Sequence, residues 1–170
     1  MRKILLNTFY LGDQIENFIK SKNFSIDIQV IGDGNKILNT GGGILNMINN
    51  SQDNDYLIFN PDTLWGTNHL DEINNMMKFY FLNKLNNILL VANKKLSFDE
   101  NLQSDFELEN NLLKKNEHKN FIYTGCQILN KDLFSRCRVE NFPISKIWNE
   151  LLRNNQLNGF ESKTKFYHLT

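Results

Sequence analysis

Three consecutive glycines stand between a predicted strand and a predicted helix, in the stretch Thr40-Gly41-Gly42-Gly43-Ile44. Glycines in such a run cost conformational entropy, so a fold keeps them where side chains would obstruct a close approach. Backbone amides at the start of a helix can bind the phosphate or the base of a nucleotide. A tight turn into a helix, with no ligand, explains the run equally well.

The carboxylate of Asp62 is a second candidate, because it follows the apolar run Tyr56–Asn60 after one proline. In open α/β sheets, ligands bind outside the carboxyl ends of the strands. A carboxylate at that place can hold Mg²⁺, which prefers oxygen ligands and bridges phosphates. The alternative is that Asp62 caps a helical turn that follows it.

Gly125 interrupts a predicted strand in Tyr123-Thr124-Gly125-Cys126. A glycine inside a strand indicates either a β-bulge or a backbone that a ligand approaches closely. Asp105 precedes this strand and is a candidate for a polar contact to a sugar, although exposed aspartates commonly have no such role. The histidines lie far apart in the sequence and do not show the spacing of a zinc site.

Alternating strand and helix patterns must position these residues, and together they predict one α/β domain spanning residues 1–170. The apolar run Tyr56–Asn60 is typical of a strand buried on both faces of a parallel sheet. The strand-like segments Phe106–Leu113 and Phe121–Leu129 flank a polar turn around Lys114–Lys119 and predict a hairpin. The predicted strands are Lys3–Asn7, Ser25–Ile31, Tyr56–Asn60, Asn87–Ala92, Phe106–Leu113, Phe121–Leu129 and Phe166–Leu169, and the predicted helices are Asp13–Lys20, Ile44–Ile48, His69–Leu82, Lys131–Phe134 and Pro143–Leu152.

Composition excludes several classes of protein. Hydrophobic residues make up 41% of the 170 residues, which is enough for a buried core. The formal net charge is zero, so the chain has no basic excess with which to bind nucleic acid. No apolar run approaches the roughly 18 residues of a membrane helix, and the N-terminal residues do not form a signal peptide. We therefore expect a cytoplasmic protein.

Taken in order, the motifs resemble those of the sugar-1-phosphate nucleotidyltransferases, also called NDP-sugar pyrophosphorylases. Within that family the sequence is most similar to the N-acetylmuramate 1-phosphate uridylyltransferases and the mannose-1-phosphate guanylyltransferases. The resemblance covers nearly the whole chain. Its segments are Ile4–Ile19 (second strand and helix), Leu38–Ile44 (nucleobase loop), Leu57–Trp65 (the strand ending in Asn-Gly-Asp), Asp105–Leu108 with Tyr123–Leu129 (sugar-binding hairpin) and Pro143–Gly159.

This resemblance implies a reaction in which a sugar 1-phosphate and a nucleoside triphosphate give a nucleotide-sugar and pyrophosphate, as in nucleotide-sugar biosynthesis for the cell wall. It implies a Rossmann-like, GT-A-like three-layer sandwich. It also implies three groups of site residues: a catalytic carboxylate that binds Mg²⁺ (Asp62), nucleotide-binding residues (Thr40, Gly41, Gly42, Gly43 and Asn60) and sugar-binding residues (Asp105, Thr124 and Gly125).

The chain also departs from the family pattern. The family begins with a strand leading into Gly-x-Gly-Thr-Arg and has a later Pro-Lys, and this sequence starts after both, so we expect a domain without its first strand and phosphate loop. His168 stands where the family has its second metal carboxylate, Asn39 replaces a glutamate, and Pro61 replaces a glycine. We expect a truncated enzyme that is inactive alone and is completed by a separately encoded N-terminal fragment. The alternatives are a non-catalytic nucleotide- or sugar-binding remnant, a decaying gene product, or a protein-interaction module.

Overall fold

The computed structural model describes residues 3–169, and the chain divides into two compact units. The first unit contains the chain up to Asp53 together with Phe134–Ile147. The second contains Asn54–Leu133 and the chain from Trp148 onward. Compact units of one chain can belong to one domain, so the assignment of a single domain to residues 1–170 stays a prediction.

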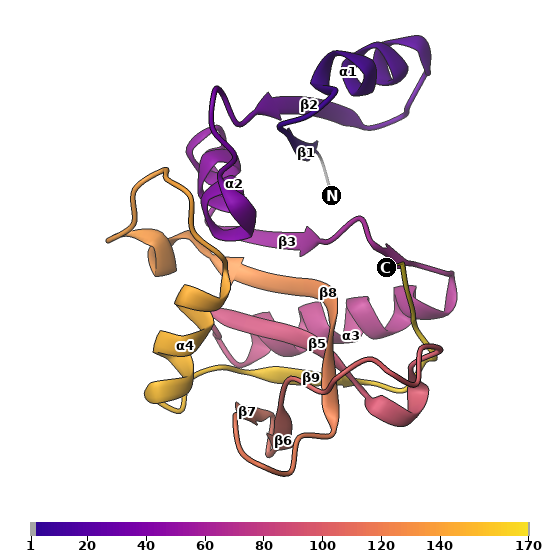
Figure 1. The fold of residues 1–170 in the computed structure, drawn as a ribbon, viewed down its shortest axis with the longest axis vertical. Helices are drawn as coiled ribbons and strands as arrows, with labels where there is room; N and C mark the ends of the chain where they lie inside the picture. The colour runs from indigo at the N-terminus through magenta and orange to yellow at the C-terminus, as the bar shows by residue number, and fades with distance from the viewer. Residues whose placement is uncertain (1–2, 170) are drawn as a thin grey trace. The chain divides into compact units, whose positions relative to one another are not determined.

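The first unit begins with a β-α-β arrangement, followed by a second helix (Figure 1). The strands β1 (Lys3–Thr8) and β2 (Asp27–Gly32) pair in parallel, and the helix α1 (Gly12–Ser21) connects them. The helix α2 (Asn39–Asn49) follows. These elements confirm the predicted order of strands and helices. The prediction was possible because alternating apolar residues favour a strand, whereas apolar residues three or four apart favour a helix.

The second unit is built on a four-stranded sheet in the order β3-β8-β5-β9, and the four strands follow one another in this order in Figure 1. Strand β8 runs antiparallel to both of its neighbours, while β5 and β9 are parallel. Residues of β5 from Asn87 to Ala92 are fully buried, as expected for a central strand. The bounds are β3 (Asp55–Phe59), β5 (Asn87–Asn93), β8 (Phe121–Asn130) and β9 (Gly159–Ser162).

Helices cover both faces of this sheet, which gives the predicted three layers. The helix α3 (Asn68–Leu82) packs Ile73, Met76 and Tyr80 against one face. The helix α4 (Ser145–Arg153) contacts the other face, where the indole Nε1 of Trp148 donates a hydrogen bond to Gln127 at 3.1 Å. Gln127 lies next to Ile128, which faces α3, and neighbouring residues of a strand point to opposite faces.

Strand β3 differs from the prediction of a strand buried in a parallel sheet. It pairs antiparallel with β8, and within residues 3–169 this is its single strand partner. Its residues are partly exposed, and Phe59 keeps 41% of its surface. An apolar run shows that a strand is buried to some degree but does not show the direction of its partner, so the prediction was wrong on this point.

The predicted hairpin also has a different register. Its turn lies at Asn110 and Asn111, which have φ angles of 51° and 62° and join β6 (Glu107–Glu109) to β7 (Leu112–Lys114). Asparagine tolerates this left-handed conformation, so two adjacent asparagines can form a two-residue hairpin turn. The long strand β8 pairs with β3 and β5, and the predicted hairpin is formed only as an antiparallel bridge between Phe106 and Phe121.

Several short elements complete the second unit. Strand β4 (Thr63–Leu64) pairs antiparallel with β10 (Tyr167–His168), and this pairing places His168 opposite Thr63. Two short 3₁₀ helices, η1 (Lys94–Leu96) and η2 (Lys131–Phe134), follow β5 and β8. Within the part of the chain that the structure describes, no helix is both long and apolar enough to cross a membrane.

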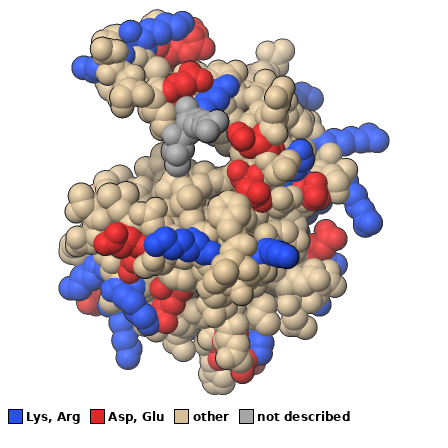
Figure 2. Space-filling model, turned by 180° about the vertical axis from the view of Figure 1, so that it is seen from behind, with Lys and Arg blue, Asp and Glu red and all other residues tan. Residues whose placement is uncertain are grey.

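Charged side chains are mixed on the face shown in Figure 2, where Lys and Arg alternate with Asp and Glu and broad uncharged areas lie between them. This distribution agrees with the formal net charge of zero. On this face the charges do not separate into a positive and a negative side.

Candidate functional site

The glycine run lies inside the first turn of α2 and is buried. The backbone N–H groups of Gly41 and Gly42 both donate to the carbonyl oxygen of Phe142, at 2.9 and 3.1 Å. A Cβ atom on Gly41 would lie 2.4 Å from the ring of Phe142, and one on Gly42 would lie 2.0 Å from the carbonyl oxygen of Glu140. The close approach that the run predicts is therefore made by the protein itself, by the ring and backbone of Phe142 at Gly41 and by the backbone of Glu140 at Gly42.

Gly43 faces a different, polar environment. A Cβ atom here would lie 2.7 Å from Nδ2 of Asn7 and 4.0 Å from Oδ1 of Asp33. Asn7 lies near the carboxyl end of β1, and Asp33 directly follows β2. The Oδ1 atom of Asp33 is buried and has no hydrogen-bond partner among the described residues. Gly43 thus adjoins polar groups at the strand ends, where α/β proteins bind ligands.

Sequence reasoning missed Asn7 and Asp33. The available signal was that each stands at the end of a predicted strand, before a turn. Thr40, which was predicted, has its hydroxyl engaged, because it accepts a hydrogen bond from the N–H of Ile144 at 2.9 Å. Asn39 has a φ of 61°, and its side-chain oxygen accepts from the N–H of Thr40 at 2.7 Å.

In the second unit, Asp62 lies where β3 ends and β4 begins. No helix starts directly after it, since α3 begins at Asn68, so the alternative that Asp62 caps a helical turn is wrong. Its Oδ1 atom is buried without a hydrogen-bond partner in residues 3–169, and its Oδ2 atom lies 3.8 Å from Nε2 of His168. The backbone N–H of Leu169 donates to the carbonyl oxygen of Asp62 at 2.7 Å, which fixes the two chain segments together.

Gly125 marks a bulge in β8, which confirms that interpretation of its place in the strand. Its φ is 89°, in the left-handed region that favours glycine, and the pairing of β5 with β8 shifts register between Leu89 and Val91. A Cβ atom on Gly125 would lie 2.9 Å from Oγ1 of Thr63 and 3.1 Å from Cβ of Asn60. The bulge therefore brings β8 against the segment that carries Asp62.

The other predicted sugar-binding residues are engaged within the fold. The buried hydroxyl of Thr124 donates to the carbonyl oxygen of Leu90 at 2.9 Å. The carboxylate oxygen Oδ2 of Asp105 accepts from the backbone N–H of Tyr123 at 3.0 Å. Both contacts hold β8 in place, and a role for these residues in binding a sugar stays a prediction.

Tyr123 is a residue whose importance the sequence did not show. Its hydroxyl oxygen is buried and has no hydrogen-bond partner within the described part of the chain, and its ring packs edge-on against Trp148 with centroids 4.9 Å apart. Burial raises the pKa of Tyr123 well above its ordinary value, and the nearby Cys126 and Asp62 raise the pKa further. Tyr123 therefore stays protonated, and its hydroxyl is a donor without an acceptor among the described residues.

The residues around Asp62 fit the Mg²⁺ that the resemblance implies only in part. Mg²⁺ takes a near-octahedral set of oxygen ligands and usually binds one or two carboxylates together with phosphates and waters. Here one carboxylate is present, and an imidazole stands at the second position. Within residues 3–169 no group of three or more His, Cys, Asp or Glu is placed to hold a metal ion.

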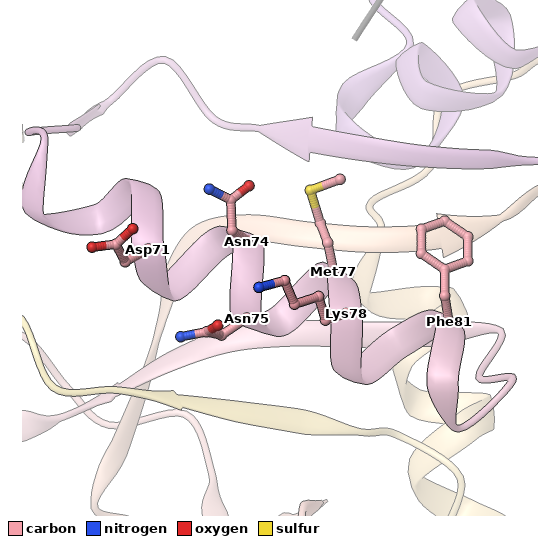
Figure 3. A pocket seen from close by; sticks show the side chains of 6 residues that line it. All are labelled: Asp71, Asn74, Asn75, Met77, Lys78 and Phe81. Atoms are coloured by element: carbon pink, nitrogen blue, oxygen red, sulfur yellow. The ribbon is translucent and has the colours of Figure 1, made fainter.

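A surface hollow of about 710 Å³ lies elsewhere, on α3. Figure 3 shows that its side chains all come from this one helix and spread along it. None of the predicted site residues contributes to it. Its lining residues are Asp71, Asn74, Asn75, Met77, Lys78 and Phe81.

Comparison with known proteins identifies the class of fold. A scan against protein-family models gave no match, and a search of curated protein sequences gave none. Solved structures match over almost the whole chain, and they include an inositol-1-phosphate CTP transferase, a UDP-glucose pyrophosphorylase and a putative glucose-1-phosphate thymidylyltransferase. The protein therefore has the Rossmann-like α/β fold of these enzymes.

Three solved structures illustrate the likeness. The inositol-1-phosphate CTP transferase from T. maritima has a TM-score of 0.78 and 12% identity, over 99% of this chain and 70% of its own. HddC from Yersinia pseudotuberculosis has a TM-score of 0.75 and 17% identity, over 99% of this chain and 73% of its own. A UDP-glucose pyrophosphorylase complexed with UDP-glucose has a TM-score of 0.71 and 13% identity, over 98% and 75%. At these identities the likeness shows the fold.

Proposed function

We propose that this chain is part of a sugar-1-phosphate nucleotidyltransferase, which joins a sugar 1-phosphate to a nucleoside triphosphate and releases pyrophosphate. The observation that carries the proposal is the match to solved structures over 96–99% of the chain. The matched proteins are named as an inositol-1-phosphate CTP transferase, a UDP-glucose pyrophosphorylase and a putative glucose-1-phosphate thymidylyltransferase. A cytoplasmic location and a role in nucleotide-sugar biosynthesis for the cell wall are part of this proposal.

The nucleotide site in this proposal lies at the strand ends of the first unit. Asn7 and Asp33 supply amide and carboxylate groups beside Gly43, and these groups suit the hydrogen-bonding edge of a base or the hydroxyls of a ribose. The side chain of Asn7 is exposed on β1. Replacing Asn7 with Ala is therefore expected to weaken nucleotide binding, measured by calorimetry, without unfolding the protein.

The reacting groups in this proposal lie in the second unit. Transfer of a nucleotidyl group depends mainly on positioning the two substrates and on stabilising the charge that develops on phosphate oxygens. Asp62 has a buried carboxylate oxygen without a partner, and Tyr123 has a free hydroxyl donor. Asp62 would hold a divalent cation that neutralises the phosphate charge, because a carboxylate alone repels phosphate groups. Asn60 and Gly125 pack against each other next to Asp62 in the chain fold, since a Cβ atom on Gly125 would lie 3.1 Å from Cβ of Asn60.

We further propose that the chain is inactive alone and that a separate polypeptide completes it with a strand and a Gly-x-Gly-Thr-Arg segment. Two observations support the narrower point that the chain is a partial one with room for a further strand. The chain spans about 70–75% of the length of the solved structures that it matches. In addition, β1 and β3 each have a strand partner on a single edge within the described residues, and free strand edges accept further strands.

The test measures pyrophosphate release from CTP, GTP, UTP and dTTP with a panel of sugar 1-phosphates. The chain is assayed alone and mixed with a separately produced polypeptide that carries a strand and the Gly-x-Gly-Thr-Arg segment. We expect release only from the mixture. Replacing Asp62 with Asn should lower the rate about 10²–10³-fold, while Asp132→Asn, at an exposed carboxylate in η2, should not. Release from no combination would refute the proposal.

A second candidate function is nucleotide or sugar binding without turnover. It is favoured by the engagement of the Gly41 and Gly42 amides with Phe142 and by the imidazole of His168 beside Asp62. Calorimetry separates the two functions. Binding of a nucleotide to the chain alone, with no pyrophosphate release from the mixture, would favour the binding function.

A further inference from the structure

One flank of the helix α3 carries a regularly spaced row of side chains. The row consists of Leu70, Asn74, Met77 and Phe81, and Figure 3 shows the last three on the same side of the helix. Leu70 keeps 58% of its surface exposed and Phe81 keeps 57%. Alternating steps of four and three residues are the spacing with which a helix packs its side chains against those of a second helix.

Two opposite charges border this row on its solvent side. Asp71 and Lys78 are both exposed, and they lie two turns apart on the helix. Side chains pair along a helix when they are three or four residues apart, so these two do not reach each other. Neither forms an ion pair with any other charged residue between Lys3 and Leu169. Both charges are therefore available to a partner.

The row of side chains is complementary to itself. When two copies of α3 lie antiparallel about a two-fold axis, Leu70 of each copy can pack against Phe81 of the other. Asn74 then lies beside Met77 of the other copy, and the two Asn74 residues are offset by about 4.5 Å along the helix axis. Their amide groups can hydrogen-bond to each other, and one polar residue in such a helix contact fixes its register.

The charges are complementary in the same register. Asp71 of one copy and Lys78 of the other border the same side of the contact, offset by about 3 Å along the helix axis. The two-fold axis generates this ion pair twice. Charges that match in this way favour one partner and one orientation over others. The occupant that they fit is a second copy of this helix.

We propose that two copies of this chain associate through α3, packed antiparallel about a two-fold axis. The helix has 15 residues and is about 22 Å long, so one helix pair buries less than the roughly 1,200 Å² at which stable interfaces begin. We therefore expect a weak dimer whose fraction rises with protein concentration. None of the predicted substrate-binding residues lies on this surface, so the inference does not depend on the proposed function.

The test is sedimentation velocity of the chain over a wide range of protein concentration. The unaltered chain should change from monomer to dimer as the concentration rises. Reversing either charge, in Asp71→Lys or in Lys78→Glu, turns both ion pairs into repulsions and should weaken association at least about tenfold. An equimolar mixture of these two variants should associate about as well as the unaltered chain, because each chain supplies the charge that the other lacks.

The matched control is Asp132→Lys, the same charge reversal at an exposed carboxylate in η2, which should leave association unchanged. Phe81→Lys removes one end of the row and should prevent association in every combination. Circular dichroism checks that each variant is folded. These controls separate a contact through α3 from a general effect of charge.

Three results would each overturn the inference: a monomer at every concentration, a dimer that neither charge reversal weakens, or a mixture that associates no better than the single variants. The proposed function is tested by pyrophosphate release and can stand or fall separately. If the mixture with the completing polypeptide releases pyrophosphate while the chain alone stays monomeric, the inference fails and the proposed function stands. If the two charge variants restore each other while no pyrophosphate is released, the dimer stands and the proposed function fails.

Discussion

Two glycines in the same turn of α2 should respond in opposite ways to the addition of one methyl group. In Gly42→Ala the new Cβ atom would lie 2.0 Å from the carbonyl oxygen of Glu140, a backbone atom that moves only if its whole segment shifts. In Gly43→Ala it would lie 2.7 Å from Nδ2 of Asn7, the end of a flexible side chain. The two changes are chemically identical and differ in what the added methyl meets.

The expected magnitudes follow from two opposing effects. Replacing glycine with alanine inside a helix stabilises it by about 1 kcal/mol. Forcing an extra methyl group into packed surroundings typically costs about 1–3 kcal/mol, and an immovable backbone oxygen places Gly42 at the upper end. Gly42→Ala should therefore lower the free energy of unfolding by about 2 kcal/mol. Gly43→Ala should leave it unchanged or raise it by up to about 1 kcal/mol, because the side chain of Asn7 can rotate away.

The assay is urea unfolding of both variants and of the unaltered chain, followed by circular dichroism and extrapolated to water. A stability of Gly42→Ala equal to that of the unaltered chain would refute the conclusion that the backbone of Glu140 packs against this glycine. Equal destabilisation by both changes would also contradict it, since that outcome would show that the helix disfavours any substituent in its first turn.

Further predictions concern the buried phenols and thiols. The hydroxyl of Tyr80 donates to Asp55 at 2.6 Å, so Tyr80→Phe should cost about 1.5–3 kcal/mol in urea unfolding; no loss would show that this hydrogen bond does not contribute. The pKa values of Tyr80 and Tyr123 are raised, mainly by burial, so the folded state holds these protons more tightly than the unfolded chain. The resulting stability is complete below about pH 10 and is lost as pH rises further, and Tyr80→Phe should make the decline of the unfolding free energy shallower. Cys126 is fully buried and its pKa is raised by burial, so iodoacetamide should label Cys137 first, as mass spectrometry would show; equal labelling would contradict the packing of β8.

The order of helices and strands could largely be predicted from the sequence, because periodicity is a local property. Alternation in Ser25–Ile31 and helical spacing in Asp13–Lys20 led directly to β2 and α1. The pairing of strands could not be predicted in this way. The turn at Asn110 and Asn111 was missed, although two adjacent asparagines are a recognisable hairpin signal.

The candidate site shows a similar division between local and distant information. The glycine run correctly predicts a close approach to α2, but the sequence does not show that Glu140 and Phe142, about a hundred positions later, make that approach. The resemblance placed His168 at the position of a second metal ligand, and the structure brings it to 3.8 Å from Asp62. Asp62 and His168 meet because of a pairing between two-residue strands, which are too short to show a period.

The first unit contains Phe134–Ile147 as well as the N-terminal segment, so it can finish folding only after this later segment has been synthesised. The amides of Gly41 and Gly42 have no Phe142 carbonyl to bind until that residue has left the ribosome, so the start of α2 waits for most of the chain. At a translation rate of roughly 5–20 residues per second, this wait lasts several seconds. The first unit is then complete at Ile147, before β9 and β10 exist to finish the second. A ribosome that stops ahead of Phe142 would therefore release a chain in which neither unit can close.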